Sequence, residues 1–174
     1  MAKIIYKEGC EGQNRLESID GIEIEMFNGQ RALIYPKYEV HEMFEEGKEI
    51  EWDAKRVSEI EALKKTDNLW ATGALLRCGS PAAEFASNFR SDKHGIFGLP
   101  TLLAAMEIQD QKKDIDALAE TIKGADLLRN FSSLVWSCSH FSSVNGWIAV
   151  GNGGYAGGND LCNQLLCIPL VLYR

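Results

Sequence analysis

The sequence predicts a single α+β domain over residues 1–174, with helices followed by short strands in a mixed or antiparallel sheet. Three observations predict this class. A chain of 174 residues is long enough to bury a sizeable core. Four segments with helical periodicity and capping residues lie before Asn130. From Asn130 to Tyr173 the only charged side chain is Asp160, and Ser, Gly, Asn and aromatic residues there indicate strands joined by tight turns.

The N-terminal part predicts strands. Lys3 to Lys7 is expected to form the first strand. A hairpin then follows, in which residues 21–27 return through Asn28-Gly29 into residues 31–35. Asn-Gly between two apolar runs is a strong short-range signal for a hairpin, because both residues tolerate positive φ.

The first two predicted helices are defined by their starts. Asp53 is expected to cap a helix that extends to about Lys65. Ser80 is expected to cap a second helix, because Pro81 is favoured at the first helical position. The apolar faces are Val57, Ile60 and Leu63 in the first helix and Phe85 and Phe89 in the second.

Two further helices are predicted before Asn130. Thr101 is the expected N-cap of one, and Asp114 is the expected N-cap of the other, which should stop at Gly124. Their buried faces are Leu102, Leu103 and Met106 in the former and Ile115, Leu118 and Ile122 in the latter.

The last third of the chain predicts three strands, 133–137, 146–150 and 165–173, with a glycine-rich loop over 151–159. The apolar neighbours of the tryptophans indicate where each of them lies. Trp52, Trp70 and Trp136 are expected in the core, and Trp147 suits either the core or a ligand surface.

The charge balance excludes some partners. With 18 basic and 25 acidic residues the net charge is −7, so no basic face for nucleic acid or anionic membrane is expected. Nine acidic and three basic residues lie between Glu39 and Glu61, and the acidic run from Glu42 to Glu51 indicates a solvated face. Neither a signal peptide nor a run of about 18 apolar residues is visible, so we expect a chain that is cytoplasmic as synthesised, with no direct membrane insertion.

The sequence predicts no metal and no cofactor. Its five cysteines contain no Cys-x-x-Cys pair, and the spacing of Cys138, His140, Cys162 and Cys167 fits no common zinc site. One carboxylate near Asn159 is too few for tight calcium binding. Residues 151–156 fit Gly-x-Gly-x-x-Ala, but glycines follow where a dinucleotide site needs a helix.

The residues from Gly95 onward resemble a known pattern, in order and over roughly the last 80 residues. The bacterial and phage family that carries it has LPT, then WSSS-x-Y/F-SS-x-N-A-W, a glycine- and asparagine-rich loop, and V-R-P-V-L. It is related to the C-type-lectin-like fold of formylglycine-generating enzymes, and it includes the variable proteins of diversity-generating retroelements. The matching segments here are GLPT (98–101), KKDIDAL (112–118), WSCS (136–139), FSS (141–143), NGW (145–147) and IPLVLY (168–173).

This resemblance implies a C-type-lectin-like fold with short antiparallel strands and two to four helices, in which residues 95–174 are the lectin-like region. It also implies a non-enzymatic module that binds a protein or glycan on a target surface. Such a protein would be phage- or prophage-encoded, carried on a virion or displayed by partner proteins, and a homo-oligomer would be compatible with it. The ligand-facing positions that it implies lie within residues 138–166 and are Cys138, His140, Ile148, Val150, Asn152, Tyr155, Asn159, Leu161, Asn163 and Leu165.

Departures from the family pattern leave alternatives open. Ile168 replaces the usual Arg, the usual loop Lys is missing, and the resemblance hardly reaches residues 1–66. A formylglycine-generating-type cysteine oxidoreductase would require a reactive Cys162 or Cys167 with a lowered pKa. Cys138 and His140 could form a nucleophile and base, although a buried Cys beside a surface His is the favoured interpretation.

The other alternative is a structural or assembly module of a phage or surface particle. It predicts a large apolar interface around three residues, Ile148, Leu161 and Leu165.

Overall fold

The computed structural model describes residues 1–46, 58–142, 144–151 and 155–174, and it confirms the α+β class. Within these residues there are five α-helices, more than the two to four expected. They are α1 (Glu59–Leu63), α2 (Leu69–Arg77), α3 (Pro81–Ser87), α4 (Leu102–Asp110) and α5 (Lys112–Ala119). None of the described helices has the length and apolar character needed to cross a membrane.

The first sheet has four strands in the order β1-β2-β3-β11, all antiparallel. It contains the predicted first strand and the predicted hairpin, whose turn includes Gly29 at a φ of 79°. A positive φ at this position explains why glycine follows Asn28. The strands are β1 (Lys3–Tyr6), β2 (Ile19–Glu25), β3 (Arg31–Ile34) and β11 (Leu170–Tyr173).

The second sheet has five strands in the order β4-β10-β7-β8-β9. Only the β10–β7 pair is parallel. The strands are β4 (Glu39–His41), β10 (Leu165–Cys167), β7 (Leu134–His140), β8 (Asn145–Val150) and β9 (Tyr155–Asp160), and β5 (Arg90–Ser91) and β6 (Gly95–Ile96) form a separate small hairpin.

Two predictions about the C-terminal strands are wrong in detail. The single strand predicted over 165–173 is divided into β10 and β11, which belong to different sheets. The division lies at Ile168-Pro169, where proline has no N–H to donate to a ladder. The predicted loop over 151–159 contains β9, in which Gly157 and Gly158 pair with β8 at the sheet edge.

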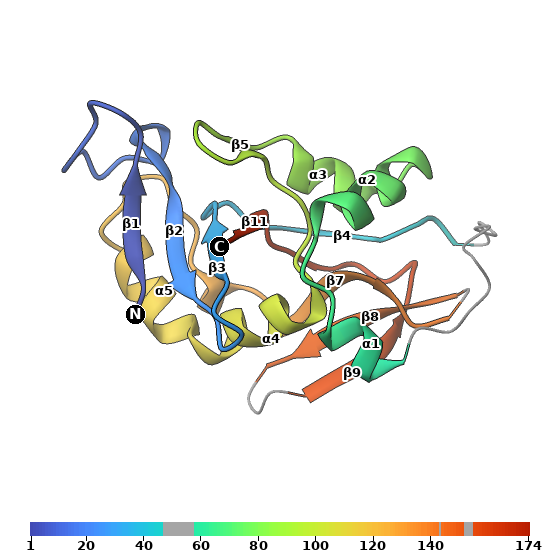
Figure 1. The fold of residues 1–174 in the computed structure, drawn as a ribbon. Coiled ribbons are helices and arrows are strands. Elements are labelled where there is room, and N and C mark those ends of the chain that lie inside the picture. Colours follow the sequence, from blue (N-terminus) through green and yellow to red (C-terminus); the bar gives the residue numbers. More distant parts are fainter. Residues whose placement is uncertain (47–57, 143, 152–154) are drawn as a thin grey trace.

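Residues 1–46, whose role the sequence left unclear, complete both sheets. β3 pairs with β11 along its whole length, and β4 pairs with β10. In Figure 1, β1–β3 lie on the left and β7–β9 at the lower right, with α4 between them and α2 and α3 above. The strands that resemble the lectin-like family are therefore flanked by N-terminal strands.

The starts of α3 and α4 are those predicted. Ser80 Oγ accepts a hydrogen bond from the Ala83 N–H at 3.2 Å, and Thr101 Oγ1 accepts one from Ala104 at 3.3 Å. The last predicted helix begins earlier, because α5 starts at Lys112 and Asp114 lies inside its first turn. It ends at Ala119, so the buried Ile122 lies beyond it in the turn that Gly124 closes at a φ of 90°.

The first predicted helix is shorter in the structure. Ser58 caps α1 through a capping box with Glu61, a signal that the sequence analysis missed. Ile60 is 65% exposed, so the inward face is Ala62 and the partly buried Leu63. The proposed cap at Asp53, together with Val57 and Trp52, lies outside the described residues.

Helix α2 was not predicted, and its position changes the assignment of Trp70. The side chain of Asp67 accepts hydrogen bonds from the N–H groups of Leu69 and Trp70, which begins the helix. Trp70 is 73% exposed, so its assignment to the core is wrong. The core tryptophans are Trp136, which is fully buried, and Trp147, which packs with Ala62 and Leu102.

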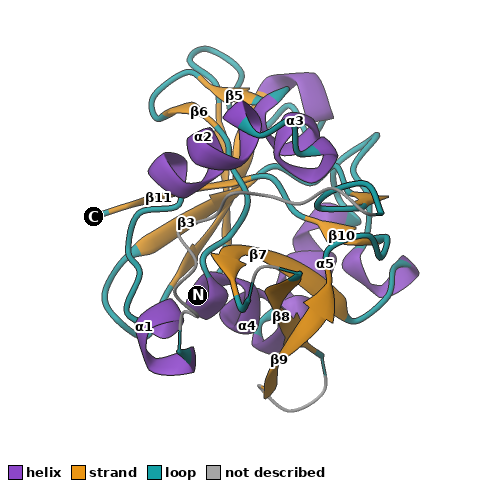
Figure 2. Cartoon of the chain, turned by 90° about the vertical axis from the view of Figure 1, so that its right-hand side faces the viewer, coloured by secondary structure: helices purple, strands orange, loops and turns teal. Residues whose placement is uncertain are grey.

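Two large apolar clusters hold the elements together. The first contains Ile22 and Ile34 of the four-stranded sheet together with residues of α4 and α5. The second surrounds Trp136 and contains residues of α2 and α3. Strands β7 and β8 therefore have helices on both faces: Val135 and Ala149 belong to the first cluster and Trp136 and Ile148 to the second. Figure 2 shows β7, β8 and β9 side by side.

A candidate ligand-binding face on strands β7, β8 and β9

The register of the five-stranded sheet brings several predicted site residues onto one face. Directly paired residues of an antiparallel sheet have their side chains on the same side. Three such rows cross β7, β8 and β9, and we call the surface that they form the β7–β9 face. The rows are Leu134–Val150–Tyr155, Trp136–Ile148–Gly157 and His140–Gly146–Asn159.

The centre of the β7–β9 face is buried. Cys138 and Ile148 are 2% and 3% exposed and pack with Trp136. Leu161 and Leu165, each 6% exposed, belong to the same cluster. The expectation that these four side chains contact a ligand is therefore not supported by their positions, because α2, α3 and the chain after β4 cover them.

The same burial bears on the proposed apolar interface. Ile148, Leu161 and Leu165 fill the core of this chain, so they present no apolar surface to another subunit. The sequence pattern did not distinguish a core position from an interface position, since an apolar residue on a strand suits both equally.

The outer margin of the β7–β9 face is open. Tyr155 is 69% exposed at the start of β9, next to the half-buried Val150. A Cβ atom placed on Gly157 would have no atom of the described residues within 4 Å, so none of these residues covers the middle of β9. An exposed aromatic ring beside an unobstructed stretch of backbone is a surface that a flat ligand can approach.

The far end of β9 carries uncharged hydrogen-bonding groups. The amide of Asn163 donates a hydrogen bond to Asn159 Oδ1, and its backbone N–H donates to Asp160 O at 3.0 Å. Asn163 is exposed and Asn159 is half-buried. The pair leaves carboxamide groups at the margin of the sheet, with a half-buried His140 two strands away in the same row.

Six of the ten predicted site residues remain after the buried ones are removed. Val150, Tyr155, Asn159, Asn163 and His140 lie at the margin or end of the β7–β9 face, and Asn152 lies outside the described residues. The family resemblance grouped these residues, and burial in the folded chain separates them from Cys138 and Ile148.

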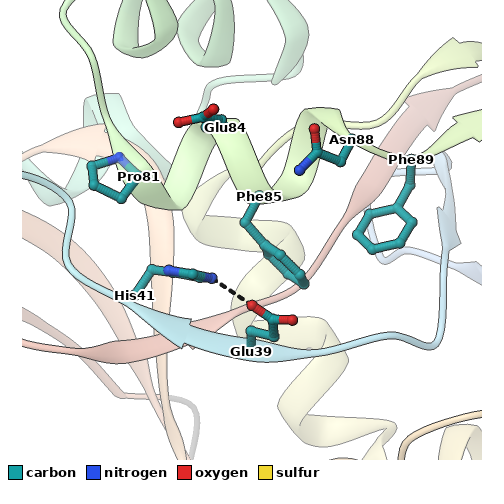
Figure 3. A pocket seen from close by; sticks show the side chains of 7 residues that line it. All are labelled: Glu39, His41, Pro81, Glu84, Phe85, Asn88 and Phe89. Atoms are coloured by element: carbon teal, nitrogen blue, oxygen red, sulfur yellow. Dashed lines mark hydrogen bonds and ion pairs between the residues drawn. The ribbon is translucent and has the colours of Figure 1, made fainter.

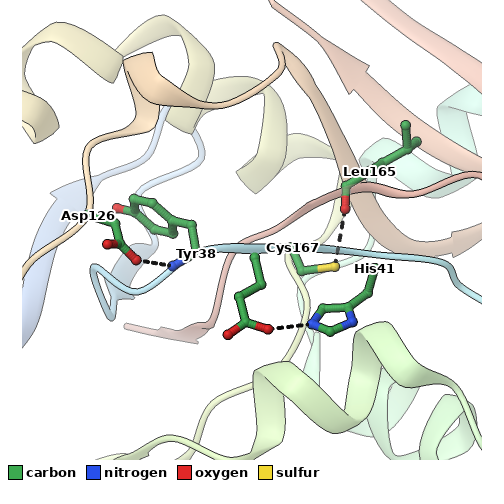
Figure 4. Close-up of polar contacts among 6 residues, drawn as sticks. Tyr38, His41, Asp126, Leu165 and Cys167 are labelled. Atoms are coloured by element: carbon green, nitrogen blue, oxygen red, sulfur yellow. Dashed lines mark hydrogen bonds and ion pairs between the residues drawn. The ribbon is translucent and has the colours of Figure 1, made fainter.

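The cysteines do not form a reactive pair. Burial raises the pKa of the Cys138 thiol to about 12, and it also raises the pKa of Cys167. The Cys167 thiol donates to Leu165 O at 3.5 Å inside the core, next to β4 (Figure 4). Both thiols are thus held in the protonated form, which is a poor nucleophile.

The described residues contain no group of three or more His, Cys, Asp or Glu that could hold a metal ion. Cys138, His140, Cys162 and Cys167 therefore do not form a metal-binding group. The thiols of Cys138 and Cys167 are buried in the core.

One feature of β4 was missed by the sequence analysis. Glu39 and His41 were not among the predicted site residues, but they line a hollow against α3 (Figure 3). The alternation Glu39-Val40-His41 was the available signal, because it places both polar side chains on one side of a strand.

Comparison of the chain with protein-family models, with curated proteins and with solved structures finds no match.

Proposed function

We propose that this protein is a non-enzymatic ligand-binding module that uses the open margin of the β7–β9 face. The observation that carries the proposal is the position of Tyr155, which is 69% exposed beside the unobstructed backbone at Gly157. Val150, Asn159 and Asn163 extend the same margin.

The chemistry of this margin suits an uncharged or weakly charged ligand. Tyrosine gives a large rigid contact area at low entropic cost, and carboxamides donate and accept hydrogen bonds. A protein or glycan on a target surface has apolar and hydrogen-bonding groups that complement the tyrosine ring and the carboxamides. The resemblance of residues 95–174 to C-type-lectin-like variable proteins supports the same class of partner. It also supports a phage or prophage origin, with the chain carried on a virion or displayed by other proteins.

Binding can be tested with the purified chain on an array of microbial and animal glycans and, in parallel, on intact bacterial cells. We expect wild-type protein to bind at least one of these surfaces. The double variant Tyr155→Ala/Asn163→Ala should bind it at least about tenfold more weakly, because both side chains are exposed at the margin.

Phe27→Ala is the matched control. Phe27 is 98% exposed on the hairpin between β2 and β3, which belong to the other sheet, so its removal should leave binding unchanged. Equal binding by wild type and the double variant, or no binding of the wild type to any tested surface, would overturn the proposal.

The relation to diversity-generating retroelements has a separate test in the DNA around the gene. A reverse-transcriptase gene and a near-copy of the last hundred or so bases would support it. Substitutions in that copy should then fall on codons such as those of Tyr155, Asn159 and Asn163, whose side chains the core does not constrain. Substitutions concentrated on Cys138 and Ile148 would contradict the proposed margin.

A further inference from the structure

A pocket of about 330 Å³ lies between β4 and α3, outside the β7–β9 face. Figure 3 shows His41 and Glu39 of β4 on one side and the side chains of α3 and the residues after it on the other. Its volume is in the range of small-molecule sites. The lining residues are Glu39, His41, Pro81, Glu84, Phe85, Asn88 and Phe89.

The two walls of the pocket are tied to the core and to each other. Trp136 Nε1 donates a hydrogen bond to His41 O at 2.9 Å, and the Ala82 N–H donates to Glu42 O at 3.2 Å. β4 is also paired with β10 in the interior of the molecule. The pocket is therefore formed before any ligand arrives, which lowers the entropic cost of binding.

Aromatic rings form the apolar part of the lining. The imidazole of His41 lies against the Phe85 ring, with centroids 5.1 Å apart and planes 34° apart. Phe85 contacts Phe89 edge to face at 5.3 Å, and Phe89 stacks on Tyr35 at 4.9 Å. These contacts fix the ring orientations, so the pocket offers flat surfaces to a planar group.

Carboxylates supply the charge of the pocket. Glu39 Oε2 accepts a hydrogen bond from His41 Nε2 at 2.8 Å, and this bond orients the Glu39 carboxylate. Glu84, in the first turn of α3, is an exposed second carboxylate at the pocket, and the Asn88 carboxamide is a third polar group. The described lining residues include no Lys or Arg, so the pocket favours a cation.

We propose that this pocket binds a guanidinium group. A guanidinium is planar, stacks on aromatic rings and donates two parallel hydrogen bonds to a carboxylate. An alkylammonium matches the charge but neither the flat aromatic lining nor the two-oxygen geometry of a carboxylate. The inference is independent of the proposed function, because none of the lining residues belongs to the β7–β9 face.

Nuclear magnetic resonance titration of the ¹⁵N-labelled full chain tests this proposal. The probe is Nα-acetyl-arginine methylamide, and the neutral citrulline analogue of the same shape is the matched control ligand. We expect saturable shifts of backbone amides in β4 and α3, with a Kd of about 1 mM for so small a ligand. The citrulline analogue should bind at least about tenfold more weakly, because it lacks the charge.

Protein variants locate the binding site. Glu39→Gln and Glu84→Gln should each weaken binding of the arginine probe by about threefold or more, because each removes a negative charge from the pocket. Glu11→Gln makes the same change at an exposed position outside the pocket and should leave binding unchanged. Phe89→Leu keeps the apolar volume but removes a ring. It should reduce the preference for the arginine probe over Nα-acetyl-lysine methylamide, the corresponding alkylammonium probe.

Comparison of the blocked probe with free L-arginine distinguishes the source of the ligand. Equal or tighter binding of the blocked probe indicates an arginine side chain of a partner protein, and tighter binding of free arginine indicates a small molecule. The proposal is overturned if arginine and citrulline probes bind equally, if no saturable shifts arise in β4 and α3, or if Glu11→Gln weakens binding as much as Glu39→Gln.

Discussion

Glu23 is a buried carboxylate in β2 that three neighbours stabilise. Its side chain is 9% exposed and lies 2.9 Å from Lys3 Nζ and 3.6 Å from the guanidinium of Arg31. The Tyr173 hydroxyl donates a hydrogen bond to it. Burial by itself raises the pKa of Glu23, but the hydrogen bonds from Tyr173 and Lys3 and the two positive charges outweigh burial and lower this pKa.

Replacement of Glu23 by Gln should lower the free energy of unfolding at pH 7 by about 1 to 3 kcal/mol, because the buried charge-assisted hydrogen bonds are lost. Because the pKa of Glu23 is lower in the folded than in the unfolded chain, its ionised side chain stabilises the folded protein at pH values above the unfolded-state pKa. This stabilisation is lost as the pH falls through the folded pKa. The difference between wild type and Glu23→Gln should thus shrink below about pH 4.5.

Urea unfolding of wild type and Glu23→Gln at a series of pH values measures this difference. The control is Glu25→Gln, at the exposed end of the same strand, which should change stability by less than about 0.5 kcal/mol. A difference that grows on acidification would show that the sign of the pKa shift is wrong.

The five cysteines differ in exposure, and this difference predicts their reactivity. Cys78 is exposed, Cys10 and Cys162 are half-buried, and Cys138 and Cys167 are buried with raised pKa values. Iodoacetamide at about pH 8 should modify Cys78 fastest and leave Cys138 and Cys167 unmodified in the native protein.

Mass spectrometry of digested samples identifies the modified cysteines, and urea-unfolded protein, in which all five react, is the control. Native-state modification of Cys167 at the rate of Cys78 would support the cysteine oxidoreductase alternative and contradict the burial seen here.

At the scale of the element, two glycines in neighbouring strands have opposite environments. A Cβ on Gly146 of β8 would lie 2.9 Å from Trp136 Cζ3 and 3.3 Å from Leu161 Cδ2. A Cβ on Gly157 of β9 would have no atom within 4 Å in the part of the chain that the structure describes. The inner strand is therefore packed against the core, whereas the edge strand is open on the β7–β9 face.

Gly146→Ala should destabilise the protein by about 1 to 3 kcal/mol, because Trp136 and Leu161 must move. Gly157→Ala should change stability by less than about 1 kcal/mol, since nothing opposes the added methyl group and alanine loses less backbone entropy. Thermal unfolding of the two variants measures both effects, and each variant is the control for the other. Equal destabilisation would mean that β9 is covered on this face.

At the scale of the whole molecule, each of the last two strands, β10 and β11, pairs with a strand from the first 46 residues. β11 is bonded to β3, and β10 lies between β7 and β4. Asn68 adds to this connection, since its buried amide donates to Leu99 O and Leu170 O, both at 3.0 Å.

A fragment of residues 95–174 should accordingly fail to fold alone, because β3, β4 and the helices α2 and α3 that cover Trp136 are missing. Circular dichroism should show no cooperative thermal transition for the fragment, in contrast to the full chain as a control. A sigmoidal transition in the fragment would show that the region resembling the lectin-like family is an independent domain.

Local features of the sequence were sufficient to predict many elements. Asn28-Gly29 predicted the hairpin, and Ser80-Pro81 and Thr101 predicted the starts of α3 and α4. These signals are interactions within a few residues of the chain, so they do not depend on the rest of the fold. The prediction failed for β9, because glycines that read as a loop are tolerated in an edge strand.

The sequence by itself determined the α+β class and the starts of α3 and α4. Only the tertiary structure decided which of the candidate site residues remain exposed. Cys138 and Tyr155 were equivalent candidates, yet one is buried under α2 and α3 and the other is open at the sheet edge. The pocket of Glu39 and His41 likewise depends on α3, which lies about forty residues further along the chain. Burial results from contacts between distant segments, and no local pattern specifies which segments will meet.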